Sequence, residues 1–329
     1  MKRKLNILLS IVMVAALVLG GMHCLEGIMT PPSVAVCMNY VEAFHKLPSN
    51  SAEVMIYGSS HAWHGCDTRE LYRKYGIAAY NYGCNWQNIN TTALFLEDSF
   101  RTQSPKVVLI ETVLSADVLH DVDFNGEIAY TRAIPMFKGK WEYLRQCFGN
   151  RLERYLSYAF PIVSFHENWS AEKPSEVYPL EDHQAILSRG GFPPSNKVEP
   201  IVIPDYRNFQ SMQYTPQALE WLDKIVAMCK EHNAEIVFFT VPYLWEHPYI
   251  QAMEEYAAAN GYPYLNLFDH LDETGIDGQT DFMDAGHLNT SGGQKMADYL
   301  GAYLKEHYDL TDYRSDPDSL WSQMMSAAE

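Results

Sequence analysis

The chain has 329 residues, of which 47% are hydrophobic and 13% aromatic; this composition can bury a substantial core and argues against a disordered protein. Its formal net charge is −17, from 24 basic and 41 acidic side chains. This balance argues against nucleic acid as a partner, because binding to phosphates requires clustered Lys and Arg.

A basic and then apolar segment opens the chain. Basic residues at positions 2–4 precede the mostly apolar run 5–22, whose length is at the short end of the range for a membrane-spanning helix. The basic flank should stay cytoplasmic, which would place the rest of the chain outside the cell membrane. We expect residues 1–23 to be a single-pass anchor. Cleavage as a signal peptide, which would give a secreted protein, is the alternative, although no Ala-x-Ala-like site stands out.

After a juxtamembrane connector over 24–50, with a short helix at 36–44, strands and helices alternate. We expect strands at 53–57, 77–82 and 107–111, and helices at 67–75 and 88–102. Asp67 and Glu70 have the spacing of a capping box, and Gly76 suits the left-handed position that ends a helix. The run 107–111 is apolar almost throughout, which is typical of a strand buried on both faces.

The same alternation resumes in the second half of the chain. We expect helices at 218–232, 247–260 and 290–307, and strands at 235–240 and 262–267. Repeated strand–helix–strand units indicate a parallel sheet with right-handed crossovers. The main domain, 51–310, is therefore predicted to be α/β, a flavodoxin-like three-layer α/β/α sandwich with five parallel strands in the order 2-1-3-4-5.

The alternation breaks down between about 116 and 212. This insertion contains a predicted helix at 141–159, followed by a Pro-rich, aromatic stretch, and it is too long for an ordinary loop. We expect it to fold over the carboxyl edge of the sheet as a lid or substrate-shaping wall. Residues 311–329 form an acidic tail, with at most a loose helix.

The six cysteines do not amount to the disulfide scaffold of a small secreted domain. Cys66 and Cys84 both fall in loops predicted to lie beside the site, so one bridge between them is conceivable. Free thiols are the simpler interpretation.

A serine directly follows the first predicted strand, in Gly58-Ser59-Ser60-His61. Ligand crevices form at the carboxyl ends of parallel strands, but a hydroxyl is a poor nucleophile until a base takes its proton; alone, this serine could equally cap a turn. Asp284 and His287, three residues apart just before the last helix, can place a carboxylate against Nδ1 and leave Nε2 outward as a base. We therefore expect Ser60, His287 and Asp284 to be nucleophile, base and orienting acid. A solvated surface loop is the alternative for the Asp/His pair.

These blocks resemble those of the SGNH/GDSL-type hydrolases. Gly58-Ser59-Ser60 matches the family's Gly-Asp-Ser block with Ser in place of Asp, and residues 284–287 match its Asp-x-x-His block. The resemblance covers roughly 53–111 and 214–307. It implies the SGNH fold, a serine esterase or acyltransferase activity on ester bonds, and Ser60 as the nucleophile.

The resemblance also implies an oxyanion hole built from the N–H of Ser60 and that of Gly83, after the second strand. The family's third donor, an Asn in a Gly-x-Asn-Asp block after the third strand, is absent, because residues 111–114 read Glu-Thr-Val-Leu. Asn85 is the candidate replacement, and a simple turn former is the alternative for it.

An anchor and a missing third block resemble extracytoplasmic members of the wider group, such as the D-alanyl-transfer protein and polysaccharide O-acetyltransferase accessory proteins. This similarity implies an acylated cell-envelope polysaccharide as substrate, with acetyl as the expected acyl group, and a membrane-bound O-acyltransferase as partner. The alternative is a scaffold that assists such an acyltransferase with little or no turnover of its own.

Several further residues are candidates for shaping the substrate site. They are His61, Trp86, Glu111, His166 and Trp169; for the histidines and Glu111, an ordinary structural role is the competing interpretation. His61, His64 and Asp67 have mixed spacing within one loop, which is not a diagnostic metal-ligand set. We expect neither a metal nor a cofactor.

Overall fold

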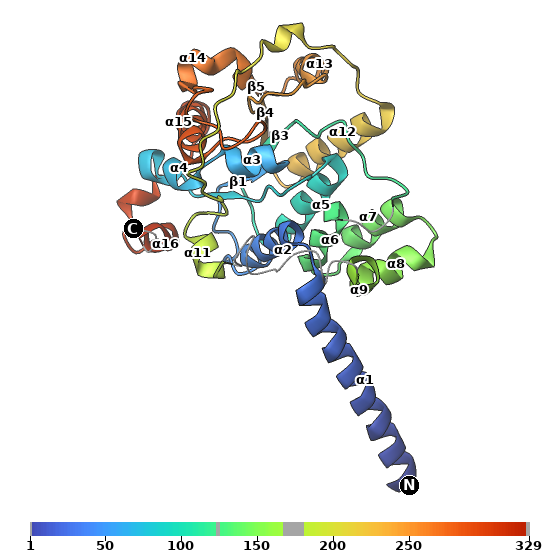
Figure 1. Cartoon of the computed structure of the whole chain (residues 1–329). Helices are drawn as coiled ribbons and strands as arrows, with labels where there is room; N and C mark the ends of the chain where they lie inside the picture. Colours follow the sequence, from blue (N-terminus) through green and yellow to red (C-terminus); the bar gives the residue numbers. More distant parts are fainter. Residues whose placement is uncertain (1, 123–125, 167–180, 327–329) are drawn as a thin grey trace.

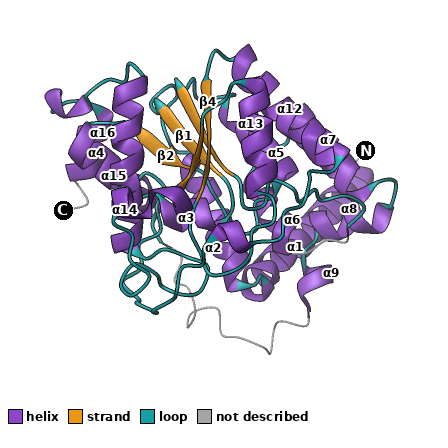
Figure 2. Cartoon of the chain, turned by 90° about the horizontal axis from the view of Figure 1, so that it is seen from above, coloured by secondary structure: helices purple, strands orange, loops and turns teal. Residues whose placement is uncertain are grey.

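The computed structural model describes residues 2–122, 126–166 and 181–326. Its centre is a five-stranded sheet in the order β2-β1-β3-β4-β5, and every neighbouring pair is parallel. The strands are β1 (Val54–Tyr57), β2 (Ala79–Asn81), β3 (Val107–Glu111), β4 (Glu235–Thr240) and β5 (Tyr264–Asn266). The predicted α/β fold and strand order are therefore confirmed, and Figure 2 shows helices on both sides of the sheet.

Helices supply the two outer layers and the attached segments (Figure 1). They are α1 (Lys2–Met29), α2 (Pro32–Phe44), α3 (Ser60–Gly65), α4 (Thr68–Tyr75), α5 (Ile89–Ser99), α6 (Gly126–Ala129), α7 (Lys138–Phe148), α8 (Leu152–Ala159), α9 (Ile162–Phe165), α11 (His183–Leu187), α12 (Pro216–Glu231), α13 (Ile250–Asn260), α14 (Leu271–Thr274), α15 (Thr290–His307) and α16 (Leu320–Ser326). Short 3-10 helices are η1 (Tyr130–Ala133), η3 (Tyr206–Asn208), η4 (Leu267–His270) and η5 (Tyr313–Ser315).

The sheet is buried on both faces. Successive side chains of a strand point to opposite faces, so Met55 and Tyr57 of β1 join a core with residues of α2, α5 and α12, whereas Val54 and Ile56 join a second core with residues of α4 and α15. All four β1 residues are buried. Since both faces are covered, the ligand-accessible part of the sheet is its carboxyl edge.

The ends of α4 show one local prediction that holds and one that does not. Gly76 ends the helix at φ 68°, and the Asp67 carboxylate accepts a hydrogen bond from the Arg69 N–H at 3.0 Å. The predicted capping box is wrong. Glu70 instead pairs with Arg73, and the Asp67 N–H that a box would satisfy donates to the Gly293 carbonyl of α15 at 3.2 Å.

Other departures from the predictions lie where tertiary packing decides. Residues 60–65, expected as loop, form α3. The single helix expected at 141–159 is two helices, α7 and α8, separated at Gly149, whose φ of 60° and ψ of −133° no helix accommodates. The tail is not loose: Trp321 of α16 is 1% exposed and donates its indole N–H to the Ser51 carbonyl.

Two further predictions concern the cysteines and the N-terminal segment of the chain. All six cysteines are free, and Cys24 is the exposed one, so no bridge joins Cys66 and Cys84.

Within α1, residues Arg3–Met22 are long and apolar enough to cross a membrane, and none of this window is buried. A signal sequence passes the same test. Figure 1 shows α1 projecting away from the rest of the chain.

We predict that Gly76→Ala destabilises the protein more than Gly261→Ala. Both glycines end a helix in the left-handed conformation, at φ 68° and 72°, which costs a residue with a Cβ about 1–2 kcal/mol. A Cβ on Gly76 would also collide with Asp312, whereas at Gly261 the described residues leave the space open. Denaturant unfolding of the full chain in detergent measures both, and equal losses would contradict the packing argument.

Candidate active site

The turn after β1 places Ser60 at the carboxyl edge of the sheet. Gly58 has φ 139°, and a Cβ built there would lie 2.5 Å from the Cβ of Glu111, so this position requires glycine. Ser59 then caps α3, its hydroxyl accepting the His61 N–H at 3.3 Å. Ser60 is the first residue of the helix. The Ser60 side chain therefore lies just beyond the end of β1, at the carboxyl edge of the sheet.

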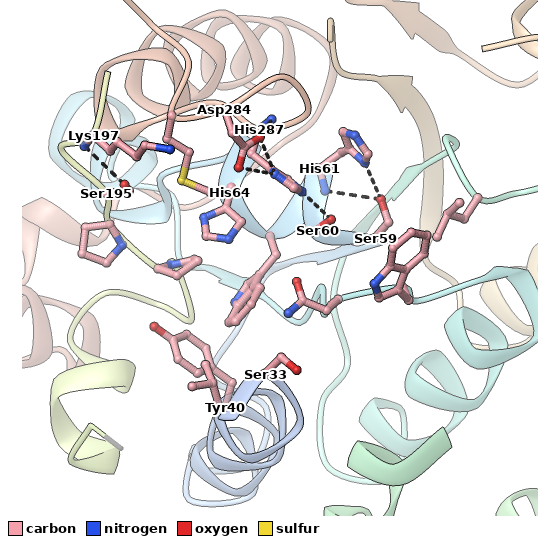
Figure 3. Close-up of a pocket in the computed structure, with 18 of the residues that line it drawn as sticks. Ser33, Tyr40, Ser59, Ser60, His61, His64, Ser195, Lys197, Asp284 and His287 are labelled. Carbon is pink, nitrogen blue, oxygen red and sulfur yellow. Dashed lines mark hydrogen bonds and ion pairs between the residues drawn. The ribbon is translucent and has the colours of Figure 1, made fainter. Parts of the chain in front are cut away.

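The structure brings Ser60 next to a histidine that is 227 residues away in the sequence. Ser60 Oγ and His287 Nε2 are 2.7 Å apart, and His287 Nδ1 lies 2.8 Å and 3.0 Å from the two carboxylate oxygens of Asp284. Figure 3 shows the three side chains in line. With Nδ1–H donating to Asp284, Nε2 is free to accept the proton of the Ser60 hydroxyl, which is the geometry in which a histidine activates a serine.

The loop that carries Asp284 and His287 is closed on itself. Phe282 and Leu288 form an antiparallel bridge, and the Asp284 carboxylate accepts the backbone N–H groups of Gly286 at 2.8 Å and His287 at 2.9 Å. Burial would raise the pKa of Asp284, but the hydrogen bonds from the His287 ring and from these N–H groups outweigh it and hold the pKa well below its usual range. The carboxylate is therefore ionised at neutral pH.

A second carboxylate lies beneath the turn rather than in the cavity. Glu111 is 3% exposed, and its side chain accepts the Ser59 hydroxyl at 2.8 Å, the Ser59 N–H at 3.2 Å and the Val113 N–H at 2.5 Å. Burial raises its pKa to about 7, although these hydrogen bonds act in the opposite direction. Glu111 thus braces the residue before Ser60. The prediction that Glu111 lines the substrate site is wrong, because Ser59 lies between the Glu111 carboxylate and the cavity.

His61, which is buried, and His64, which is half-buried, flank His287. The ring centroids of His61 and His64 lie 5.2 Å and 5.4 Å from that of His287. Because the Ser59 hydroxyl donates to Glu111, His61 Nδ1, 2.9 Å from that oxygen, is the donor of their hydrogen bond. Burial, followed by the nearby His287, lowers the pKa of His61 well below its usual value and that of His64 to about 3. Both rings are therefore neutral at neutral pH and add no positive charge beside the base.

The three side chains open into a cavity of about 820 Å³, a size suited to a small ligand or a sugar unit. His61, Asn85 and Trp86 lie on its wall as expected, and Trp86 is 64% exposed. Much of the remaining wall was not foreseen. It comes from α2, from the insertion and from two later loops: Ser33, Val36, Asn39, Tyr40, Glu181, Pro193, Pro194, Ser195, Lys197, Trp245 and Met283.

The described part of the insertion is fixed against the end of the site. The Thr290 N–H donates to the Ser195 carbonyl at 2.8 Å. The Thr290 hydroxyl accepts the Ser195 N–H and donates to the Ser195 carbonyl, both at 2.9 Å, so the segment is attached to the start of α15. In another part of the cavity wall, the rings of Tyr40 and Trp63 meet edge to face, with 4.8 Å between their centroids. No sequence signal identified α2 as a wall, because its buried and exposed sides depend on what it packs against.

Comparison with known proteins adds little to what the strand order and the helices already show of the fold. No protein-family model matches the chain, and no curated protein matches it. Among solved structures, it is similar to a Bacteroides fragilis protein described as a "putative acylhydrolase", with 10% sequence identity and a TM-score of 0.40 over 81% of this chain and 94% of that one. At this level of similarity, the chemistry has to be argued from the residues of this chain.

The expected oxyanion donors differ in their positions. Ser60 is at the first position of α3, where a helix leaves its N–H groups without intrahelical partners. Asn85 lies on the cavity wall. The Gly83 N–H, in contrast, already donates to the Asn81 side chain at 3.1 Å, and Gly83 is buried and is not itself a lining residue of the cavity. A role for Gly83 stays a prediction that would require this hydrogen bond to break.

Two other candidates, His166 and Trp169, belong to the insertion. His166 follows α9, and its Nδ1 bonds the Val163 carbonyl at 2.8 Å. It is not among the residues that line the cavity around Ser60, so its role in shaping the substrate site stays a prediction. Trp169 lies outside the described residues. Within the described ranges, no group of three or more His, Cys, Asp or Glu side chains could hold a metal ion.

We predict that Glu111 makes stability depend on pH between about 4.5 and 7. Its pKa rises from 4.5 to about 7 in the folded protein, so in this window the native state binds more protons than the unfolded state. Stability is therefore lost as the pH rises, by up to about 1.4 kcal/mol per pH unit. The difference in unfolding free energy between wild type and Glu111→Gln, measured by denaturant titration at several pH values, should fall accordingly.

The exposed Glu142 provides the matched control for this titration. The same titration of Glu142→Gln measures the effect of removing one acidic side chain from the surface. A difference for Glu111→Gln that does not change with pH would show that the buried carboxyl is ionised with an ordinary pKa.

Proposed function

We propose that the protein is a serine esterase or O-acyltransferase in which Ser60 is the nucleophile, His287 the general base and Asp284 the residue that orients His287. The observation that carries the proposal is the 2.7 Å separation of Ser60 Oγ and His287 Nε2, with Asp284 on the other ring nitrogen. A histidine held in this tautomer can take the serine proton and later return it.

The proposed reaction proceeds through an acyl-enzyme. His287 Nε2 takes the Ser60 proton as Oγ bonds to the ester carbonyl carbon. The tetrahedral intermediate then collapses, the bond to the leaving alcohol breaks, and His287 gives that alcohol the proton. Water or a sugar hydroxyl next attacks the acyl-Ser60, losing its proton to His287, which returns it to Oγ. Asp284 stays ionised and offsets the positive charge of His287 in each step.

The oxyanion in this scheme is stabilised at the start of α3. The N–H of Ser60 is one donor, and the helix N-terminus carries partial positive charge. Asn85, on the same cavity wall, is the proposed second donor. Gly83 could act only after its N–H leaves Asn81.

We further propose an acylated cell-envelope polysaccharide as substrate, with acetyl as the acyl group, and a location outside the cell membrane on an uncleaved α1. The cavity has the volume for a sugar unit, and exposed aromatic side chains at Trp86 and Trp245 offer flat faces to a pyranose ring. Transfer would replace hydrolysis wherever a sugar hydroxyl reaches the acyl-enzyme before water. A membrane-bound O-acyltransferase would supply the acyl group in that case.

Two observations favour a second function, a scaffold with little or no turnover. The Gly83 N–H is occupied by Asn81, and the family's Asn block after β3 is replaced by Glu111-Thr112-Val113-Leu114. Each missing oxyanion donor costs about 10²–10³ in rate. Such a protein would hold a polysaccharide for an acyltransferase partner.

A serine-directed phosphonate distinguishes the two functions. We predict that the full chain in detergent is labelled at Ser60, that Ser60→Ala abolishes labelling and lowers hydrolysis of an activated acetyl ester by at least about 10³-fold, and that Ser104→Ala, on an exposed serine far from the cavity, changes neither. Mass spectrometry locates the adduct. No adduct between pH 6 and 9 would reject the enzyme and leave the scaffold.

Asp284→Asn should lower kcat by roughly 10³–10⁴-fold with little effect on KM. The amide cannot accept the Nδ1 proton as a carboxylate does, so the wrong tautomer of His287 faces Ser60. Ester hydrolysis followed against substrate concentration separates the two constants. A rise in KM of comparable size, with kcat unchanged, would mean that Asp284 binds substrate rather than orienting His287.

A further inference from the structure

The described part of the insertion presents an apolar helix face to solvent. On α8, Leu152, Tyr155, Leu156 and Ala159 are spaced as i, i+3, i+4 and i+7, which puts them on one stripe. Leu152 is 68% exposed and Leu156 48% exposed. A stripe with this spacing normally packs against another element. Here Tyr155 packs against Trp141 and Phe148 of α7, while Leu152, Leu156 and Ala159 are left exposed by the described residues.

The apolar surface continues from α8 onto α7. The Trp141 ring lies 5.6 Å from that of Tyr155 and is 50% exposed as a residue, while Met136, just before α7, is 58% exposed. Together with the α8 stripe, they line a groove of about 840 Å³ that also includes Arg145. We call this surface the α7–α8 face. A contiguous apolar patch of this kind marks an interaction site.

The α7–α8 face lies close to the candidate membrane span. Short helix α9, which follows α8, contacts α1, and Figure 1 shows α8 and α9 at the end of the body from which α1 emerges. The span ends at Met22, and Met29, at the end of α1, packs against the core. Those seven residues cover about 10 Å, little more than one headgroup layer. If α1 spans a bilayer, this end of the body lies at its surface.

The exposed charges beside this groove are more basic than the chain as a whole, which carries −17. Of the six Lys and Arg within residues 130–159, Lys140 and Arg154 are buried, and Arg151 and Arg154 pair with Asp121. Arg132 and Arg145 line the groove outside the core, together with one acidic side chain, Glu42. Basic side chains near a membrane are attracted by anionic lipid headgroups, while Trp and Tyr favour the boundary between headgroups and acyl chains. Apolar, aromatic and basic groups on one helical surface are the features of an element that lies in a membrane interface.

We propose that the α7–α8 face docks onto the surface of an anionic lipid bilayer beside the anchor, with Trp141, Leu152 and Leu156 entering the headgroup boundary. The domain is then held at two places, by α1 and by this face, and cannot swing freely on the connector. Because α2 starts three residues after α1 and forms a wall of the cavity, this docking fixes the height and direction of the cavity above the membrane. The inference depends on α1 being an anchor and is independent of the chemistry of Ser60.

Spin-label accessibility in nanodiscs tests the docking. The full chain with Cys24→Ser, which removes the exposed thiol, is reconstituted without other proteins in nanodiscs containing phosphatidylglycerol. A nitroxide is attached at Leu152→Cys, at Leu156→Cys or, as a control, at Val202→Cys. Val202 is 77% exposed, and its neighbour Ile201 bonds Gly278 near α14, at the opposite end of the body from α1 in Figure 1.

We expect labels at 152 and 156 to collide more with lipid-soluble oxygen than with a water-soluble nickel chelate, and the label at 202 to show the reverse. Equal, water-like accessibility at all three positions would overturn the proposal. Protection of 152 and 156 from both reagents would overturn it too, because it would mean that protein, such as a second copy of the chain, covers the face instead of lipid.

Discussion

The hydrogen bonds between the buried Glu111 carboxylate and Ser59 are the contact on which the candidate active site depends. Parallel pairing of β1 with β3 sets Tyr57 opposite Ile110, so the chain leaves β1 directly above Glu111. Gly58 has no side chain where Glu111 passes, and the carboxylate then takes both the N–H and the hydroxyl of Ser59. The turn is thereby fixed in the one conformation that makes Ser60 the first residue of α3.

The second half of the site is fixed by a different set of contacts. The loop before α15 is closed by the Phe282–Leu288 bridge, and α15 contacts both α3 and α4. Its Gly293 carbonyl accepts the N–H of Asp67, which lies a few residues beyond Ser60. The helix that follows His287 therefore packs on the helix that begins at Ser60. This packing, rather than any local preference, sets the 2.7 Å distance between the two side chains.

The cavity joins this site to the parts of the chain outside the sheet. Its walls come from α2 on the anchor side and from residues 193–197 of the insertion. The same insertion carries the α7–α8 face. One inserted region thus shapes the pocket with one segment and, on our proposal, holds the domain against the bilayer with another.

Local sequence determined the elements whose physics is local. The apolar run 107–111 predicted a buried strand, Gly76 predicted the left-handed helix end, and the spacing of Asp284 and His287 made a carboxylate–imidazole pair possible, with a solvated loop as the alternative. Tertiary structure decided what depends on distant partners. The Asp67 N–H bonds the Gly293 carbonyl of α15 instead of the Glu70 carboxylate that a capping box would use. Glu111 supports the turn at Ser59 because β3, which carries it, pairs with β1. A sequence states which groups a segment carries, but the partner of a buried polar group is chosen by the fold that surrounds it.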